Sequence, residues 1–219
     1  MIFALDDTHN FPPPHLAEPD GLLAIGGDLS PERLLCAYRL GIFPWYDKPP
    51  ILWWSPSPRF VLFPDELKIS KTLRPLLRRD AFVFSINKAF REVMQHCKDV
   101  PRNGQQGTWI NDAIIDSYTT LHRMGFANSA EVWQNGELVG GLYGVRMGKV
   151  FFGESMFSLV SNASRYAFTK YIQQTNPVLV DCQVHSAYLE SMGARMIEGS
   201  DFSALLKENL SDTQSINEI

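Results

Sequence analysis

The chain has 219 residues, a length that suits one larger domain or a small domain joined to a medium one. Its formal net charge of −4 excludes a broadly basic nucleic-acid binder, so any contact with RNA must come from a local basic patch. Three widely spaced cysteines, with no C-x-x-C pair, argue against a zinc ribbon or a disulfide framework. The N-terminus lacks the features of a signal peptide, and no run approaches the ~18 apolar residues of a membrane span. We therefore expect a cytoplasmic protein.

The first part of the chain predicts one strand and one helix. The apolar run at 22–28 ends in Gly-Gly-Asp and predicts a short strand followed by a turn. Ser30 supplies an N-cap hydroxyl and Pro31 suits the first helical position, so a helix is expected over 30–40. Gly41 is expected to end that helix in the left-handed conformation.

Prolines mark the segments that follow. In 43–46 and 52–56 they argue against regular structure. The composition changes near Arg59, which indicates a domain boundary. We expect a small N-terminal domain over 1–59 and a second domain over 60–219.

Hydrophobic periodicity predicts the elements of the second domain. In chain order these are a strand at 59–63, a helix at 70–79, a strand at 82–86, a helix capped by Asn87, a helix from Asn111 to Gly125, strands at 130–134, 137–145 and 149–152, a helix at 162–174, a strand at 178–183, a helix ending at Gly193 and a strand at 194–197. Asn135-Gly136 is a strong type I′ hairpin signal. A meander followed by a β-α-β unit indicates a mixed α/β sheet, an order that resembles the GCN5-related acetyltransferase fold.

The helix at 70–79 carries a cationic stripe formed by Lys71, Arg74, Arg78 and Arg79. At ~100° per residue, the first three lie within about 60° of one another, and leucines cluster on the opposite side. Such a stripe suits phosphate contacts, although a solvated surface face would look the same. Pro75 lies inside this helix and is expected to kink it.

Glu154 lies in the segment 153–157, which we place at the end of a central strand, where α/β sheets tend to bind ligands. A surface carboxylate is the alternative interpretation. An acyl-CoA enzyme of this fold would need a glycine-rich loop to bind pyrophosphate, and none is present between Phe157 and Arg165. We therefore expect a donor other than acyl-CoA.

Polar residues also end the strand at 178–183. Alternation places Asp181 and Gln183 on one face, where a carboxylate beside a carboxamide can orient an amine and polarise a carbonyl. Cys182 is expected to point the other way as a buried apolar residue. The sharper alternative is a thiol nucleophile with His185 as its base.

Tryptophans and histidines offer two further kinds of site. Trp45 and Trp109 lie in irregular segments and are candidates for stacking a nucleobase, worth ~1–3 kcal/mol each. Trp133, in an alternating strand, is expected to belong to the core. The five histidines show no metal-ligand spacing.

Seven motifs taken together are more specific than any one of them. They are Gly26-Gly27-Asp28-Leu29-Ser30-Pro31, Gly41-Ile42-Phe43-Pro44-Trp45, Leu52-Trp53-Trp54-Ser55-Pro56, Gly107-Thr108-Trp109-Ile110, Gly140-Gly141-Leu142-Tyr143-Gly144, Gly153-Glu154-Ser155-Met156-Phe157-Ser158 and Asp181-Cys182-Gln183. In this order, from about Pro19 to Gly193, the chain resembles the leucyl/phenylalanyl-tRNA–protein transferases.

The resemblance implies a small N-terminal domain attached to an acetyltransferase-like domain. It implies transfer of Leu or Phe, and Met less well, from aminoacyl-tRNA to proteins that begin with Arg or Lys. The products would enter the bacterial N-end degradation pathway. No metal, CoA or other cofactor is implied, and nothing in the sequence suggests an obligate dimer, so we expect a monomer.

The resemblance also implies roles for individual residues. Trp45 and Trp109 would flank the terminal adenosine of the tRNA, with the polar aromatics Tyr38 and Tyr118 nearby. The apolar pocket for the donor side chain would be lined by Leu142, Phe151, Met156, Phe168, Tyr171 and Val180. Asp181 and Gln183 would lie at the reacting amine and ester, with Glu154 in the same cleft, and the basic helix would hold the tRNA body.

Two departures from the family pattern affect these expectations. Pro75 occupies a position that is often basic, so the tRNA patch would be thinner. Tyr171 places a hydroxyl where an apolar aromatic can lie, so the donor preference would shift.

The implied mechanism is attack of a free N-terminal amine on the aminoacyl ester. Gln183 would hydrogen-bond the amine or the oxyanion, Asp181 would orient Gln183, and Glu154 would pair with the cationic acceptor side chain. Two other classes remain open. One is an acyl-CoA-dependent N-acetyltransferase with an unusual phosphate loop, and the other is a non-catalytic RNA-binding protein.

Overall fold

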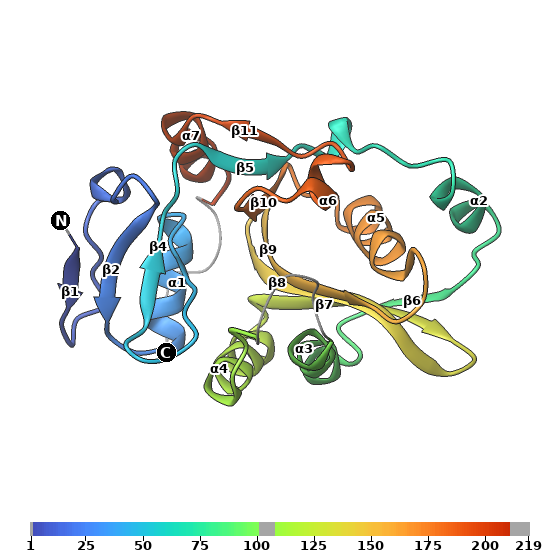
Figure 1. Ribbon diagram of the computed structural model, residues 1–219, viewed down its shortest axis with the longest axis horizontal. Helices are drawn as coiled ribbons and strands as arrows, with labels where there is room; N and C mark the ends of the chain where they lie inside the picture. The colour runs from blue at the N-terminus through green and yellow to red at the C-terminus, as the bar shows by residue number, and fades with distance from the viewer. Residues whose placement is uncertain (1, 101–107, 211–219) are drawn as a thin grey trace.

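The structure, a computed structural model, describes residues 2–100 and 108–210 and contains two sheets with helices packed on them (Figure 1). The smaller sheet has the order β1-β2-β4-β3, with β1 at Phe3–Leu5, β2 at Leu22–Gly26, β3 at Phe43–Pro44 and β4 at Leu52–Trp54. The larger sheet has the order β11-β5-β10-β9-β8-β7-β6, with bounds Arg59–Leu62 (β5), Val83–Ile86 (β6), Ala127–Gln134 (β7), Glu137–Met147 (β8), Val150–Ser158 (β9), Leu179–Gln183 (β10) and Arg195–Ile197 (β11). In the larger sheet β9 and β10 run parallel and the other described pairs antiparallel, which confirms the predicted mixed α/β class.

Helices cover both faces of the larger sheet. The helices are α1 (Pro31–Arg39), α2 (Leu73–Arg78), α3 (Phe90–Asp99), α4 (Asp112–Arg123), α5 (Ala163–Thr175), α6 (Ala187–Glu190) and α7 (Gly199–Asn209), with short 3-10 turns at Pro14–Leu16 and Pro64–Glu66. Helices α3 and α4 lie on one face and α5 on the other (Figure 1). A Cβ built on Gly140 of β8 would lie 2.4 Å from the Ala163 Cβ, so the close approach of α5 requires glycine at that position.

Several local signals act as predicted. The Ser30 hydroxyl accepts from the Arg33 N–H (3.4 Å) and caps α1. Asn111 caps α4 by accepting from the Ile114 N–H (3.0 Å). Asn135 and Gly136 both have positive φ, 54° and 84°, as a type I′ hairpin requires.

The predicted cap of α3 is wrong. Asn87 lies before the helix with a φ of 61°, and its side chain accepts from the Ser129 N–H (2.9 Å). The N-cap is Ala89, whose N–H donates to the Glu131 carboxylate (3.4 Å). The hydrogen-bond acceptor at the start of α3 is therefore Glu131 of strand β7, and not the side chain of Asn87.

Two segments whose prolines argued against regular structure form strands. The segments expected to be irregular form β3 and β4, and Pro44 lies on β3, an edge strand that needs no N–H donor on its open side. Pro75 lies in the first turn of α2, where an N–H has no partner within the helix, so the predicted kink in the middle of the helix is wrong. The structure also adds β1 and α7, which the periodicity did not indicate.

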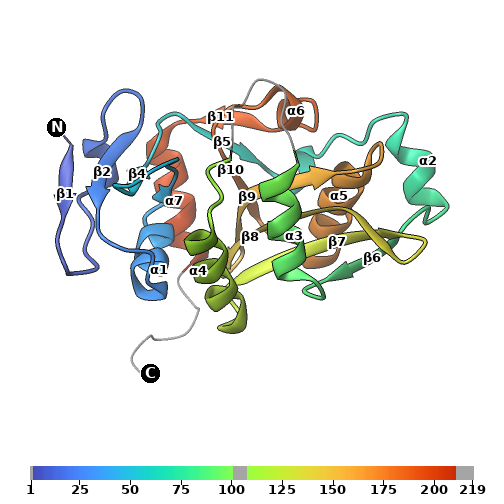
Figure 2. The ribbon, with the colours of Figure 1, turned by 60° about the horizontal axis from the view of Figure 1, so that its bottom comes forward.

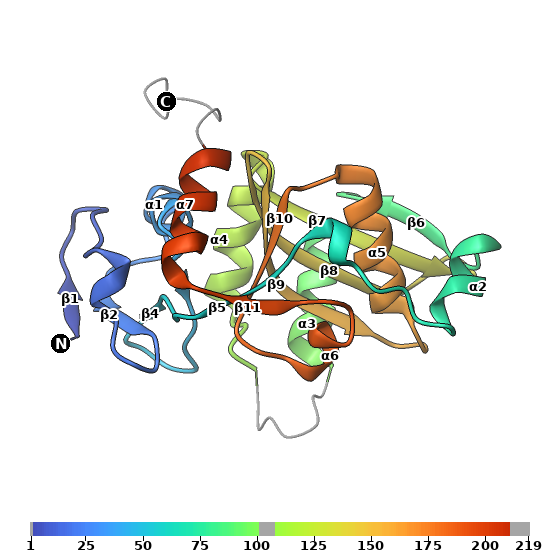
Figure 3. The ribbon, with the colours of Figure 1, turned by 90° about the horizontal axis from the view of Figure 1, so that it is seen from above.

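The hydrophobic core continues from one sheet to the other. Leu23 and Trp53 of the smaller sheet belong to the same buried cluster as Phe152 and Leu179 of the larger sheet. Helix α7 lies between the two sheets (Figures 2 and 3). The predicted boundary at residue 59 falls at the first residue of β5, and the division into two domains stays a prediction. Among residues 2–100 and 108–210, no helix has both the length and the apolar character that crossing a bilayer demands.

Candidate active site

A cavity of about 920 Å³ lies where β9 and β10 part. These parallel strands share only three register pairs, the last joining Asp181 to Phe152, while β9 continues to Ser158. Residues of both strands beyond that pair line the cavity. The end of the strand pairing therefore creates a space with backbone and side chains from two strands around it.

Most of the predicted site residues meet in this cavity. Its lining includes Trp45, Trp109, Leu142, Phe151, Glu154, Met156, Phe168, Val180, Asp181 and Gln183. Tyr38 and Tyr118 lie behind the wall, where they reach Glu154 through hydrogen bonds. Tyr171 does not line the cavity, because its ring packs behind Phe151 at a centroid distance of 4.4 Å.

Bulges aim the polar side chains into the cavity. In the β8–β9 register Tyr143 faces Ser155 and Gly144 faces Gly153, so Glu154 is the extra residue. It therefore lies within β9, not at a strand end as the sequence suggested. A β-bulge inserts one residue into a strand and can redirect its side chain, and bulges are common beside active sites.

A second bulge lies in β10 between Asp181 and Gln183. It breaks the alternation that was expected to turn Cys182 away, and Cys182 lines the cavity together with its two neighbours. The predicted burial of Cys182 is correct, but its predicted direction is wrong.

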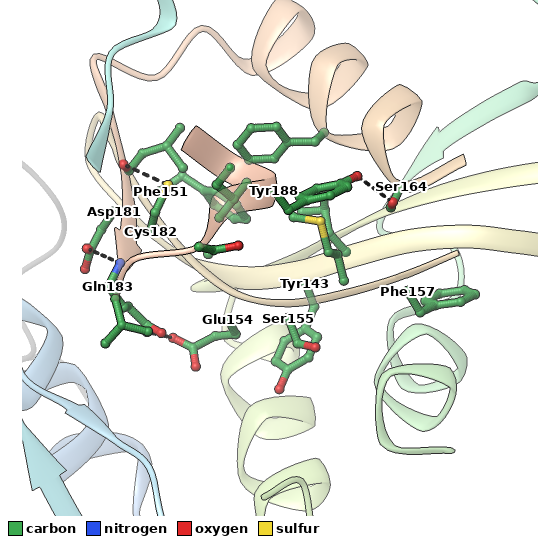
Figure 4. A pocket seen from close by; sticks show the side chains of 18 of the residues that line it. Tyr143, Phe151, Glu154, Ser155, Phe157, Ser164, Asp181, Cys182, Gln183 and Tyr188 are labelled. Atoms are coloured by element: carbon green, nitrogen blue, oxygen red, sulfur yellow. Dashed lines mark hydrogen bonds between the residues drawn. The ribbon is translucent and has the colours of Figure 1, made fainter. Parts of the chain in front are cut away.

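Glu154 is the centre of a hydrogen-bond network (Figure 4). Its Oε1 accepts from Gln183 Nε2 (2.8 Å) and from the Tyr38 hydroxyl (2.6 Å). The Tyr38 hydroxyl, from α1, is also hydrogen-bonded to the Tyr118 hydroxyl, from α4. Glu154 Oε2 is shielded from solvent and has no hydrogen-bond partner in the described part of the chain. One carboxyl oxygen is thus anchored, and the other is buried without a partner among the described residues.

Burial raises the pKa of Glu154 from 4.5 to about 8, and the negative charge of Asp181 acts in the same direction. Hydrogen bonds from Tyr38 and Gln183, and the positive charge of Arg59, oppose the rise in this pKa. Burial also raises the pKa of both tyrosine hydroxyls well above the usual value, so they remain neutral donors. A carboxyl group with a pKa near 8 can take and return a proton close to neutral pH.

Asp181 is engaged by an arginine that the sequence interpretation missed. Both carboxylate oxygens accept from the Arg59 guanidinium, at 2.8 and 2.7 Å, and Oδ1 also accepts from the Gln183 N–H (2.9 Å). A charged residue in the otherwise apolar strand at 59–62 was the available signal. The carboxylate that was expected to orient Gln183 does so through the backbone of Gln183.

The thiol-nucleophile alternative receives no support from the geometry. Burial raises the pKa of the Cys182 thiol far above its usual range, so the thiol is neutral. Its Sγ donates to the Val180 carbonyl (3.8 Å). His185 Nε2 lies 3.2 Å from Glu190 Oε2 instead of reaching the thiol.

Two of the three tryptophans considered in the sequence lie at the cavity, and the third lies outside it. Trp45 is 37% exposed and Trp109 is largely buried, and both line the cavity. Trp133 is half-buried outside the cavity, where its indole N–H donates to the Ser85 hydroxyl (2.9 Å). Gly107, the first residue of one motif, lies outside the described residues.

The far wall of the cavity contains residues that the sequence did not single out. Ser164 of α5 and Tyr188 of α6 share a hydroxyl–hydroxyl hydrogen bond (2.8 Å; Figure 4), and Leu189 also lines the cavity. Helix α6 is only one turn long and lies within the segment before Gly193 that was predicted to be helical. The cationic residues of the predicted basic helix, all exposed, lie on or beside α2 outside the cavity. Among the described residues there is no cluster of His, Cys, Asp or Glu that could hold a metal ion.

Comparison with known proteins defines the class. Residues 61–207 match the family model described as "Leucyl/phenylalanyl-tRNA protein transferase". Residues 27–57 match the model described as "Leucyl/phenylalanyl-tRNA protein transferase N-terminal domain". The class is that of enzymes that transfer an aminoacyl group from tRNA to a protein.

Curated relatives identify the family. A leucyl/phenylalanyl-tRNA–protein transferase of Syntrophobacter fumaroxidans is 53% identical over 95% of this chain and 91% of its own length. One from Flavobacterium johnsoniae is 53% identical over 90% of this chain and 95% of its own. The chain belongs to the leucyl/phenylalanyl-tRNA–protein transferase family. Among solved structures, the chain is similar to a GCN5-related N-acetyltransferase from Kribbella flavida. The identity is 10%, the TM-score is 0.34, and the match covers 74% of this chain and 59% of the other.

Proposed function

We propose that the protein transfers Leu or Phe, and Met less well, from aminoacyl-tRNA to the N-terminal Arg or Lys of acceptor proteins. We place this reaction in the bacterial cytoplasm, where a monomer would commit its products to N-end degradation. One observation carries the proposal: a single cavity joins an apolar end to the hydrogen-bonded pair Glu154–Gln183, with Trp45 and Trp109 in its wall. The names of the relatives support leucyl and phenylalanyl donors.

The apolar end of the cavity accounts for the choice of donor. Its walls are the side chains of Leu142, Phe151, Met156, Phe168 and Val180. Burial of a donor side chain there contributes about 0.8 kcal/mol per CH₂ group, and rejecting a close isostere gains only ~1–3 kcal/mol. Tyr171 lies behind Phe151 and outside the cavity lining, and its hydroxyl donates to Asn128 Oδ1 (3.4 Å), so it does not contact the donor directly.

The polar end performs the chemistry. The neutral acceptor amine attacks the ester carbonyl carbon, a C–N bond forms, and the bond to the ribose oxygen breaks. Gln183 hydrogen-bonds the amine or the developing oxyanion. The carboxylate of Glu154, which lines the cavity, takes the amine proton and returns it to the leaving ribose oxygen, so no net proton is consumed. A free N-terminal ammonium has a pKa of about 7.7–8.0, close to that of Glu154, so the neutral amine and the ionised carboxylate that the step needs are both populated near pH 8.

The aminoacyl-tRNA would contact two regions. Trp45 and Trp109 would stack the terminal adenosine, and the cations of the α2 segment would bind backbone phosphates. The cations are Lys71, Arg74, Arg78 and Arg79. Helix α2 lies at the end of the larger sheet opposite to the smaller sheet, so the tRNA body would extend along α2 and α5 (Figure 1).

A transfer assay tests the proposal. The protein is mixed with Phe-tRNA and a peptide that begins with Arg, and a peptide that begins with Glu serves as the control. We expect phenylalanine on the Arg peptide only. Folded protein that leaves the Arg peptide unmodified would refute the activity, and acetylation from acetyl-CoA would favour the N-acetyltransferase alternative.

A further inference from the structure

A buried ion pair lies directly behind Gln183 and Glu154. Arg59 Nε donates to Asp181 Oδ1 at 2.8 Å and Arg59 Nη2 donates to Oδ2 at 2.7 Å. The Arg59 side chain is 1% exposed and that of Asp181 is fully buried. Moving two charges out of water costs free energy of folding. Apolar residues of similar volume often stabilise a protein core at least as much as a buried ion pair does, so stability alone does not account for this pair.

Asp181 fixes the backbone of Gln183. Its Oδ1 accepts from the Gln183 N–H (2.9 Å), and Gln183 has a φ of 64°, a left-handed conformation that residues with a Cβ disfavour. This turn falls in the β10 bulge and brings Gln183 Nε2 to Glu154 Oε1 (2.8 Å). The direction of the Gln183 side chain thus depends on the carboxylate of Asp181.

The carboxylate of Asp181 has three donors on its two oxygens. Two come from the rigid fork of Arg59 and one from the Gln183 backbone. A two-point arginine contact fixes the plane of a carboxylate, whereas a single contact leaves it free to rotate. The role of Asp181 is therefore to fix the position of Gln183. Glu154, whose Oε2 has no partner among the described residues, is the group that transfers the proton in the proposed reaction.

Arg59 is held in turn by two aromatic rings. Its Cζ lies 4.9 Å from the ring centroid of Phe43 and 4.7 Å from that of Phe202. Phe43 belongs to β3 and lines the cavity, and Phe202 belongs to α7, near the other end of the chain. Cation–π contacts of this kind favour one placement of a guanidinium. Figure 2 shows α7 close to both β5 and the smaller sheet.

We infer that Arg59 is a positioning residue of the transfer reaction. It fixes the plane of Asp181, which fixes the turn at Gln183, which places the Gln183–Glu154 pair. The inference rests on the proposed function of that pair. Because Arg59 does not line the cavity, its effect falls on the rate of the chemical step and not on the binding of either substrate.

The test is Arg59→Lys, which retains the charge and removes the two-point contact. We expect kcat to fall by about 100-fold, as small misplacements of reacting groups do, with the KM of both substrates changed less than about threefold. Because the charge remains, the pH at which activity rises stays where it is in the parent protein. The parent protein, assayed in parallel, shows whether the proposed activity itself exists.

Stability is separated from positioning by a matched variant. Phe126→Leu alters a buried side chain outside the cavity and is expected to lower the melting temperature while kcat stays near that of the parent. An Arg59→Lys protein that is folded and retains the parent kcat would overturn the inference, as would a loss confined to KM. If Arg59→Lys does not fold, Phe202→Leu loosens the guanidinium with the ion pair intact. A severalfold drop in kcat then supports the role, and an unchanged kcat contradicts it.

Discussion

Glu154 shows how one residue can link chemistry to stability. Its Oε1 is held by Gln183 and Tyr38, and burial raises its pKa to about 8. The folded protein therefore keeps a proton that the unfolded chain, with a pKa near 4.5, has already released. Between these two pH values the unfolded state binds fewer protons, so the contribution of Glu154 lowers stability as the pH rises.

Glu154→Gln tests this linkage. The variant is expected to match the parent in stability near pH 5 and to exceed it by roughly 1–3 kcal/mol at pH 9, below the full value of the pKa shift because Glu154 borders an open cavity. Its transfer rate is expected to fall by about 10²–10⁴-fold, since the proton acceptor is gone. Urea denaturation at pH 5, 7 and 9 measures the first effect. Stability curves that run parallel across this range would contradict it.

At the residue scale, the sequence indicated the polar groups but not their arrangement. The motifs led to Glu154, Asp181 and Gln183, and all three line one cavity. Arg59 was missed because its partner lies 122 positions away, and no local pattern reports such a pair. The bulges were missed because they depend on the register between strands, which alternation along one strand cannot specify.

At the scale of elements, helix α5 and strand β8 together contribute one part of the cavity wall. Gly140 allows the Ala163 end of α5 to approach the sheet, and Ser164 and Phe168 of the same helix line the cavity. The position of this helix therefore sets the width of the apolar end.

Gly140→Ala is expected to push α5 outward. The added methyl group would destabilise the protein by about 1–3 kcal/mol, as overpacking does, and would raise the KM for aminoacyl-tRNA. Thermal unfolding and steady-state kinetics measure the two effects. The double variant Gly140→Ala/Ala163→Gly moves the methyl group from helix to strand and is expected to recover part of the stability. No loss in the single variant would show that α5 can shift freely.

Long periodic elements were predictable, and elements defined by distant contacts were not. The strands around the Asn135-Gly136 turn and the helices capped by Ser30 and Asn111 follow from local chemistry. Strand β4 pairs with β2 on one side and with β3 on the other, and β3 forms despite Pro44. At the start of α3, the N–H of Ala89 donates to Glu131, which belongs to strand β7 and lies far along the chain.

At the scale of the whole molecule, charge is unevenly placed. The net charge is −4, yet the exposed cations Lys71, Arg74, Arg78 and Arg79 gather in one short segment. An RNA that approaches such a surface releases counterions where it meets the cations, so its affinity depends on salt.

Replacement of these four residues by Gln is expected to weaken tRNA binding and to reduce the slope of log K against log salt by about 3. The control, which removes two cations instead of four, is Arg91→Gln/Lys98→Gln on α3, whose cations already pair with Asp116 and Asp112. Binding titrations from low to moderate salt measure both slopes. Equal slopes in the two variants would place the tRNA on another surface.

The walls of the cavity come from both matched segments of the chain. Phe43, Pro44 and Trp45 belong to the segment 27–57, and Glu154 and Gln183 belong to the segment 61–207. A gene crossover between relatives near codon 58 would join one half of a binding site to a foreign half. The two segments are therefore constrained to be inherited together and to change in step.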